Sequence, residues 1–177
     1  MLKHRLPSRP DLSLVFTTCV LVIQAWAFVN VSREVPAFRL RLTAWEVLGI
    51  IAYIQAFALL ESLAVLGLTI VAAVVLPGPA LREQFTAQAS VWVLISAGWA
   101  LAIHLAPQSL STWDGLTLMA WLLPYALTLG LSAWLVRRVS LVQRVINAVV
   151  GRVTMLAQVY AVIGALGLVI VIIRNLA

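Results

Sequence analysis

Five long apolar runs are the feature of this sequence that most restricts its fold. Each has about 20 residues or more, the length that a helix needs to cross the hydrocarbon layer of a bilayer. Leu, Ala, Val and Ile follow one another without regular polar alternation, which argues against the strands of a transmembrane barrel. The runs cover residues 12–31, 44–76, 86–105, 116–136 and 153–173. The sequence therefore predicts an all-α, polytopic integral membrane protein with about five transmembrane helices.

The composition agrees with this class. The mean hydropathy is +1.06, and 10% of the residues are charged, whereas an ordinary soluble domain has about 25%. No internal repeat or linker is visible, so we expect residues 1–177 to form a single transmembrane helical domain. The first run follows Lys3, Arg5 and Arg9 and also resembles a signal peptide. We interpret it as a retained transmembrane helix.

Two of the predicted helices are longer than a bilayer is thick. Thr43 to Glu46 and Ser140 to Gln143 both match the capping-box pattern that marks a helix start. Helices over 44–76 and 141–173 would each measure about 50 Å at 1.5 Å per residue, and tilt cannot absorb the whole excess. We therefore expect the second and fifth helices to extend beyond the bilayer. Asp11 is the predicted N-cap of the first helix.

The distribution of Lys and Arg predicts the orientation. Eight of the 12 basic residues fall on the side of the N-terminus and four on the other side, which favours a cytoplasmic N-terminus and an external C-terminus. Arg33, Arg39 and Arg41 argue against this assignment. Trp26 falls at a predicted external end, where interfacial tryptophans are common. The excess of Arg over Lys is associated with GC-rich bacterial genomes, so we place the chain in the bacterial cytoplasmic (inner) membrane.

Glu61 is a carboxylate inside the apolar run 47–76. In a bilayer it must be protonated, paired or in contact with water, which makes it a functional candidate. Glu46 lies about 60° away around the same helix, so the two carboxylates share a broad face. One hypothesis is an ion or proton site. The other, which we favour, is an interhelical polar contact with Gln24, Gln158 or Tyr160.

A basic segment follows the fourth run. Arg137, Arg144 and Arg152 are spaced so that they gather within about 80° of one helical face, and Arg138 is adjacent. The net charge of +6 and this amphipathic pattern indicate attraction to anionic lipid headgroups and not to nucleic acid. A phosphate site for a lipid-linked substrate, or docking of an acidic partner, is the alternative.

His104 is the remaining candidate for chemistry. It ends the third run and could in principle be an axial ligand of a haem or chlorin, although an interfacial polar residue is the simpler interpretation. We predict no cofactor. No Asp, Glu, His and Cys residues cluster in the sequence with metal-ligand spacing, so we also predict no metal site.

Small residues at helical spacing predict helix–helix packing within or between chains, because they let two backbones approach closely. Gly98 with Ala102, and Ala126 with Gly130, are two such pairs. The predicted packing residues of the fifth helix are Ala157, Ala161, Gly164 and Ala165.

Three functions fit these observations. We favour a non-catalytic integral membrane subunit or accessory protein that packs against other integral membrane subunits, or against its own copies, in a larger complex. The alternative is a small oligomeric transporter, or a proton- or ion-pathway component, that uses Glu61. The third is a membrane enzyme or binder of lipid-phosphate substrates. We do not expect an enzyme, because only Glu83 accompanies the basic segment on the predicted cytoplasmic side.

Overall fold

The computed structural model of the chain describes residues 7–76, 84–105 and 115–176, and these are almost entirely helical. All five helices contain a stretch long and apolar enough to cross a membrane, and no strand occurs in the described part. The prediction of an all-helical chain with five candidate spans is confirmed. The helices are α1 (Arg9–Arg39), α2 (Ala44–Val75), α4 (Phe85–Leu105), α5 (Gly115–Arg138) and α6 (Ser140–Leu176).

The start of α1 differs from the prediction. Ser8, not Asp11, is the N-cap, and its side chain accepts the main-chain N–H of Asp11 at 3.4 Å. Asp11 instead accepts a hydrogen bond from the Thr86 hydroxyl of α4 at 2.8 Å. The cap prediction was wrong because Ser and Asp are about equally good caps, and the sequence alone could not show that the Asp11 carboxylate has a partner 75 residues away.

The start of α2 follows the sequence pattern closely. The Thr43 hydroxyl accepts the N–H of Glu46, and the Glu46 carboxylate accepts the N–H of Thr43 at 2.8 Å. This reciprocal capping box satisfies donors that have no partner within the helix. Glu46 therefore has a local structural role.

Helix α6 begins at Ser140, directly after Val139. The predicted capping partner of Ser140, Gln143, does not reach back to it. The Gln143 Nε2 donates to the main-chain oxygen of Val136 at 2.6 Å, and so satisfies a carbonyl in the last turn of α5 that has no helical partner. The hydrogen bond ties the end of α5 to the first turn of α6.

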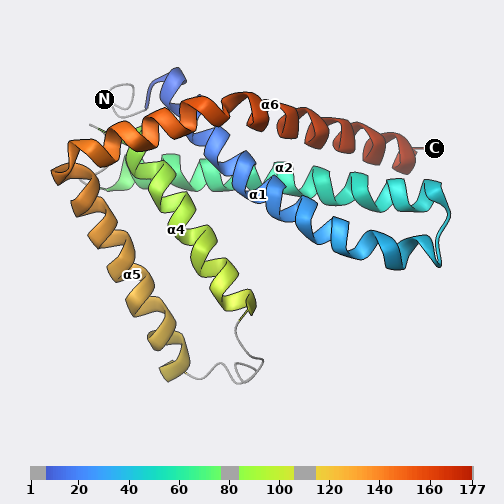
Figure 1. Cartoon of the computed structure of the whole chain (residues 1–177), viewed down its shortest axis with the longest axis horizontal. Helices are drawn as coiled ribbons and strands as arrows, with labels where there is room; N and C mark the ends of the chain where they lie inside the picture. Colours follow the sequence, from blue (N-terminus) through green and yellow to red (C-terminus); the bar gives the residue numbers. More distant parts are fainter. Residues whose placement is uncertain (1–6, 77–83, 106–114, 177) are drawn as a thin grey trace.

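Figure 1 shows two parts that meet at one end of the molecule. Helices α1, α2 and α6 pack against one another, whereas α4 and α5 form a pair that leans away from them. The ends of α2 and α5 and the starts of α4 and α6 lie close to this shared end (Figure 1). At their other ends, the α4–α5 pair and the three-helix group diverge.

Glycines of α6 allow the close packing of the three-helix group. A Cβ added to Gly167 would lie 2.7 Å from the main-chain oxygen of Ala52 in α2, and one added to Gly164 would lie 2.6 Å from Gln24 Nε2. Of the residues predicted to pack, Ala157 and Gly164 are buried, Ala161 is half-buried and Ala165 is exposed. Gly164 faces Gln24 of α1 and Leu59 of α2.

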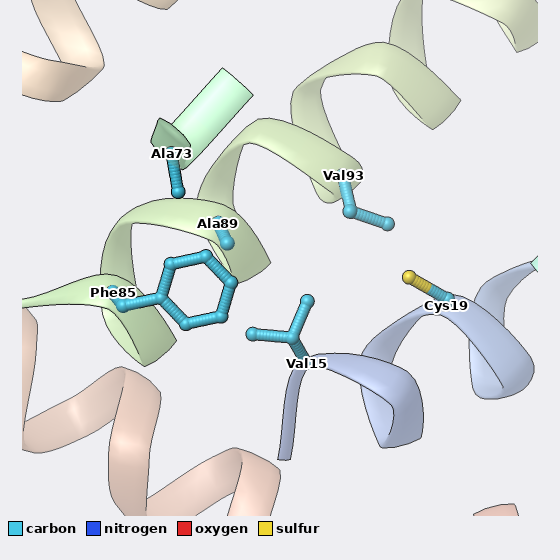
Figure 2. Close-up of a cluster of buried hydrophobic side chains, with 6 residues drawn as sticks. All are labelled: Val15, Cys19, Ala73, Phe85, Ala89 and Val93. Atoms are coloured by element: carbon cyan, nitrogen blue, oxygen red, sulfur yellow. The ribbon is translucent and has the colours of Figure 1, made fainter. Parts of the chain in front are cut away.

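A buried apolar cluster attaches the first half of α4 to α1 and α2. Figure 2 shows the Phe85 ring among Val15, Ala73 and Ala89. A buried hydrogen bond from the Thr18 hydroxyl to Ser90 Oγ, 3.0 Å long, joins α1 and α4 in the same region. Val93 is the last buried residue of α4. Beyond it, the helix leans away from the three-helix group (Figure 1), and its His104 ring still contacts Trp26 of α1.

Candidate functional site: a groove with a carboxylate

A groove of about 640 Å³ lies between α1 and α4, with Glu61 of α2 in its wall. Five residues of α1 and five of α4 complete the lining. The groove brings together two residues singled out in the sequence, Glu61 and His104, which belong to helices that separate beyond the buried cluster. It is mainly apolar, and Glu61 is its one carboxylate among the described residues.

Glu61 lies close to the middle of α2. At 1.5 Å per residue it is about 26 Å from the first residue of the helix and about 21 Å from the last. Its side chain is exposed, and within the described chain it makes no hydrogen bond or ion pair. Glu61 is therefore a carboxylate in the middle of an apolar helix that has no polar partner among the described residues.

None of the expected interhelical partners reaches Glu61 in the described chain. The Gln24 amide is completely buried and donates to the main-chain oxygen of Gln55 at 3.3 Å. Gln158 is exposed on α6, and Tyr160 is half-buried on the same helix. Neither lines the groove. Among the described residues, Gln24 instead joins α1 to α2 about two turns of α2 away from Glu61.

Trp26 and His104 form the aromatic part of the groove. Their rings meet edge to face, with centroids 5.5 Å apart and an interplanar angle of 84°. Trp26 lies near the middle of α1 because that helix continues past the apolar run to Arg39. The helix thus continues beyond Trp26, and the expected position of Trp26 at a membrane interface stays a prediction. His104 packs against an indole, and in the described chain no group of three or more His, Cys, Asp or Glu could hold a metal ion.

Small residues of α4 create the space in the groove. Ala97, Gly98 and Ala100 all line it, and a Cβ added to Gly98 would meet no other atom within 4 Å. The sequence placed Gly98 in a helix-packing pair, yet here it borders open space. An apolar groove with one carboxylate and an aromatic edge has the chemistry to hold a cation that carries apolar groups.

Glu46 is not part of this site. It lies 15 residues before Glu61, which corresponds to about 22 Å along the helix, and it does not line the groove. Its carboxylate accepts from both the N–H and the hydroxyl of Thr43. The guanidinium of Arg174 lies against Gly49 nearby, so the end of α6 brings a positive charge to the start of α2.

The predicted basic segment is located where α5 meets α6. Arg137 and Arg138 form the last turn of α5, and Arg144 and Arg152 follow on α6. All four side chains are exposed, and none is paired with a carboxylate in the described part of the chain. Cations at the end of a helix are stabilised by the partial negative charge of its carbonyls. The segment is a positively charged surface, remote in sequence from the groove.

Sequence reasoning found Glu61 and His104 separately but missed Trp26 and the shared groove. The sequence signal for the groove was the run of small residues on α4 before His104. The same pattern also predicts helix–helix packing, which is the prediction made from Gly98 and Ala102. Comparison with protein-family models, with curated proteins and with solved structures finds no match for this chain. Its function has to be inferred from these residues and their arrangement.

Proposed function

We propose that the chain is a non-catalytic, multi-pass subunit of a bacterial inner-membrane complex that packs through α5 against a helix of a partner integral membrane protein. The single observation that supports this most strongly is the outer face of α5. An exposed stripe runs along it, with two small residues at its centre. Its members are Met119, Leu123, Ala126, Gly130 and Trp134.

The small residues distinguish this stripe from an ordinary lipid-facing surface. A helix in a bilayer can leave large apolar side chains against lipid at no cost. Ala126 and Gly130 are four residues apart, and such pairs are enriched where transmembrane helices touch because the backbones can approach closely. A Cβ at Gly130 would meet no atom of the described chain within 4 Å. The partner expected here is an apolar transmembrane helix with its own small or flat contact surface.

The low burial of α5 supports the same proposal. Within the described chain, 11% of the most apolar part of α5 is buried, against 33% for α1 and α4. The ring contact of Trp99 with Trp121 and the hydrogen bond from Trp99 to Thr128 attach α5 to α4 on its inner side. The outer side is left free for a second protein.

The proposed orientation puts the meeting point of α5 and α6 at the cytoplasmic surface. Arg137, Arg138 and Arg144 would then lie at the anionic inner leaflet, as the positive-inside rule favours. The 32 residues of α2 and the 37 of α6 correspond to about 48 Å and 56 Å. Both helices would therefore project beyond a ~30 Å hydrocarbon layer.

Purification in a mild detergent tests the proposed role. The wild-type chain is expected to migrate in a complex well above its own 19.3 kDa. Gly130→Leu is expected to release it, because a bulky side chain separates the two backbones. Gly151→Leu is the matched control, since Gly151 is also an exposed helical glycine with open space around it. A wild-type chain that is a lone, monodisperse monomer would contradict the proposal, and a complex of this chain alone would identify the partner as a second copy.

Glu61 supports a second candidate, a small transporter or ion-pathway component. Its position without a described partner in a groove is the observation in favour. Proton or cation flux into liposomes that contain the purified protein distinguishes the two roles. Loss of flux in Glu61→Gln with the complex intact would favour transport. Absence of flux in the wild type would leave the subunit role as the better account. The lipid-phosphate hypothesis has only the exposed Arg137, Arg138, Arg144 and Arg152 in its favour.

A further inference from the structure

We propose that the groove between α1, α2 and α4 binds a hydrophobic organic cation, with the positive charge against Glu61 and the apolar groups against Trp26 and the small residues of α4. This site is separate from the outer face of α5, and its existence does not depend on the subunit role.

The charges around the groove favour a cation. Glu61 lines the groove with an exposed carboxylate, and no Lys or Arg is among the described lining residues. A charged group near the centre of a transmembrane helix costs about 2.5–3.5 kcal/mol on insertion scales, so a bound counter-charge would offset part of that cost. An anionic ligand would instead meet the carboxylate without any basic side chain to balance it.

The chemistry of the walls argues for an organic cation over a metal ion. Mg²⁺ and Ca²⁺ need about six oxygen ligands, and Glu61 supplies the only carboxylate among the described lining residues. The remaining walls are aromatic or aliphatic apart from His104. A cation that lies over the face of an indole is stabilised by about 0.5–2 kcal/mol. Trp26 lines the groove and is 36% exposed overall, so it can contribute such a contact.

The size of the groove suits a molecule with several apolar groups. Its volume of about 640 Å³ falls within the range of about 300–1,000 Å³ that is common for small-molecule sites. Ala97, Gly98 and Ala100 keep this space open because they have little or no side chain. A small, strongly hydrated amine would leave most of the apolar wall uncovered, so the groove selects for hydrophobic cations.

The depth of Glu61 favours the same class of ligand. The carboxylate is more than about 20 Å from either end of α2. A small hydrophilic cation would lose its hydration in the apolar surroundings of this position, whereas a cation that carries apolar groups has less hydration to lose.

Equilibrium dialysis of methyltriphenylphosphonium against the purified protein in detergent tests the proposal. The wild type is expected to bind one cation per chain saturably, and Glu61→Gln to bind about tenfold more weakly or worse. Glu34→Gln is the control and keeps wild-type affinity, because Glu34 is an exposed carboxylate of α1 outside the groove. Triphenylphosphine oxide, a neutral molecule of similar shape, is expected not to compete.

A second variant tests the location independently of the charge. Gly98→Leu places a bulky side chain in the open space of the groove and is expected to weaken binding while Glu61 is intact. Wild-type binding by both Glu61→Gln and Gly98→Leu would overturn the proposal, as would equal binding of the neutral analogue. An undetectable interaction between the cation and the wild-type protein would also overturn it.

Discussion

Gln24 of α1 donates a hydrogen bond from its Nε2 to the main-chain oxygen of Gln55 in α2, and Gly164 of α6 leaves the space that this bond occupies. A Cβ on Gly164 would come within 2.6 Å of that same Nε2. Three helices thus meet at the buried Gln24 amide. The hydrogen bond between α1 and α2 requires a residue without a side chain, Gly164, on α6.

Gly167→Ala is expected to destabilise the three-helix group. The new Cβ would lie 2.7 Å from the main-chain oxygen of Ala52. That oxygen belongs to the backbone of α2, so it can move away only if the helix shifts. Overpacking of this kind costs about 1–3 kcal/mol. Unfolding by titration with sodium dodecyl sulfate, followed by circular dichroism, measures the change. Gly67→Ala is the control, because a Cβ there meets nothing within 4 Å, and equal stability of the two variants would contradict the packing described.

Thr18 and Ser90 are expected to be energetically coupled. Their hydroxyls form a buried hydrogen bond of 3.0 Å between α1 and α4, and such bonds between membrane helices contribute about 0.6 kcal/mol on average. A double-mutant cycle of Thr18→Val and Ser90→Ala should return a coupling energy of this size. A cycle that pairs Thr18→Val with Thr154→Val on α6 should return none, because the Thr154 hydroxyl bonds only within its own helix. Additivity in both cycles would exclude the α1–α4 contact.

Thr43→Ala is expected to lower stability by about 1 kcal/mol, the usual cost of removing a helix N-cap. The substitution removes the acceptor for the N–H of Glu46 and leaves that donor without a partner inside α2. Thr17→Ala serves as the comparison, since the Thr17 hydroxyl bonds only to the carbonyl of Ser13 in the same helix. The same detergent titration measures both. A smaller effect at Thr43 than at Thr17 would argue against the capping box.

Cys19 is expected to be inert to maleimide reagents in the folded protein and to react on unfolding. Its side chain is fully buried and lies opposite Val93 in the cluster that attaches α4 (Figure 2). Asn147→Cys in a Cys19→Ala background provides an exposed thiol on α6 for comparison. The rate of labelling in detergent, with and without denaturant, is the measurement. Rapid labelling of Cys19 in the native state would show that the first half of α4 is not packed as described.

The sequence allowed the helices to be predicted because apolar runs of sufficient length have few alternatives to a transmembrane helix. The start of α2 at Ala44 followed from its capping box. The end of α1 could not be predicted in the same way. The helix continues through Arg33 and Pro36 to Arg39, and charged residues beyond an apolar run are compatible with either a helix or a loop.

The candidate site depended on tertiary structure. Glu61 was conspicuous as a carboxylate in an apolar run, but its relation to His104 arises from the angle at which α4 leaves α1. The first half of α4 packs through Phe85, Ala89 and Val93 against residues far away in the sequence, and such contacts cannot be read from a local pattern. Gly98 illustrates the ambiguity, because a small residue leaves equal room for a neighbouring helix or for an open groove.

Site-specific crosslinking from the outer face of α5 tests the proposed subunit role most directly. A photoreactive residue in place of Leu123, next to Ala126 on the exposed stripe, is introduced in cells before the membranes are solubilised. The proposal predicts a discrete adduct with another integral membrane protein from position 123 and none from position 68, an equally exposed leucine on α2. Adducts with lipid alone from both positions would contradict it.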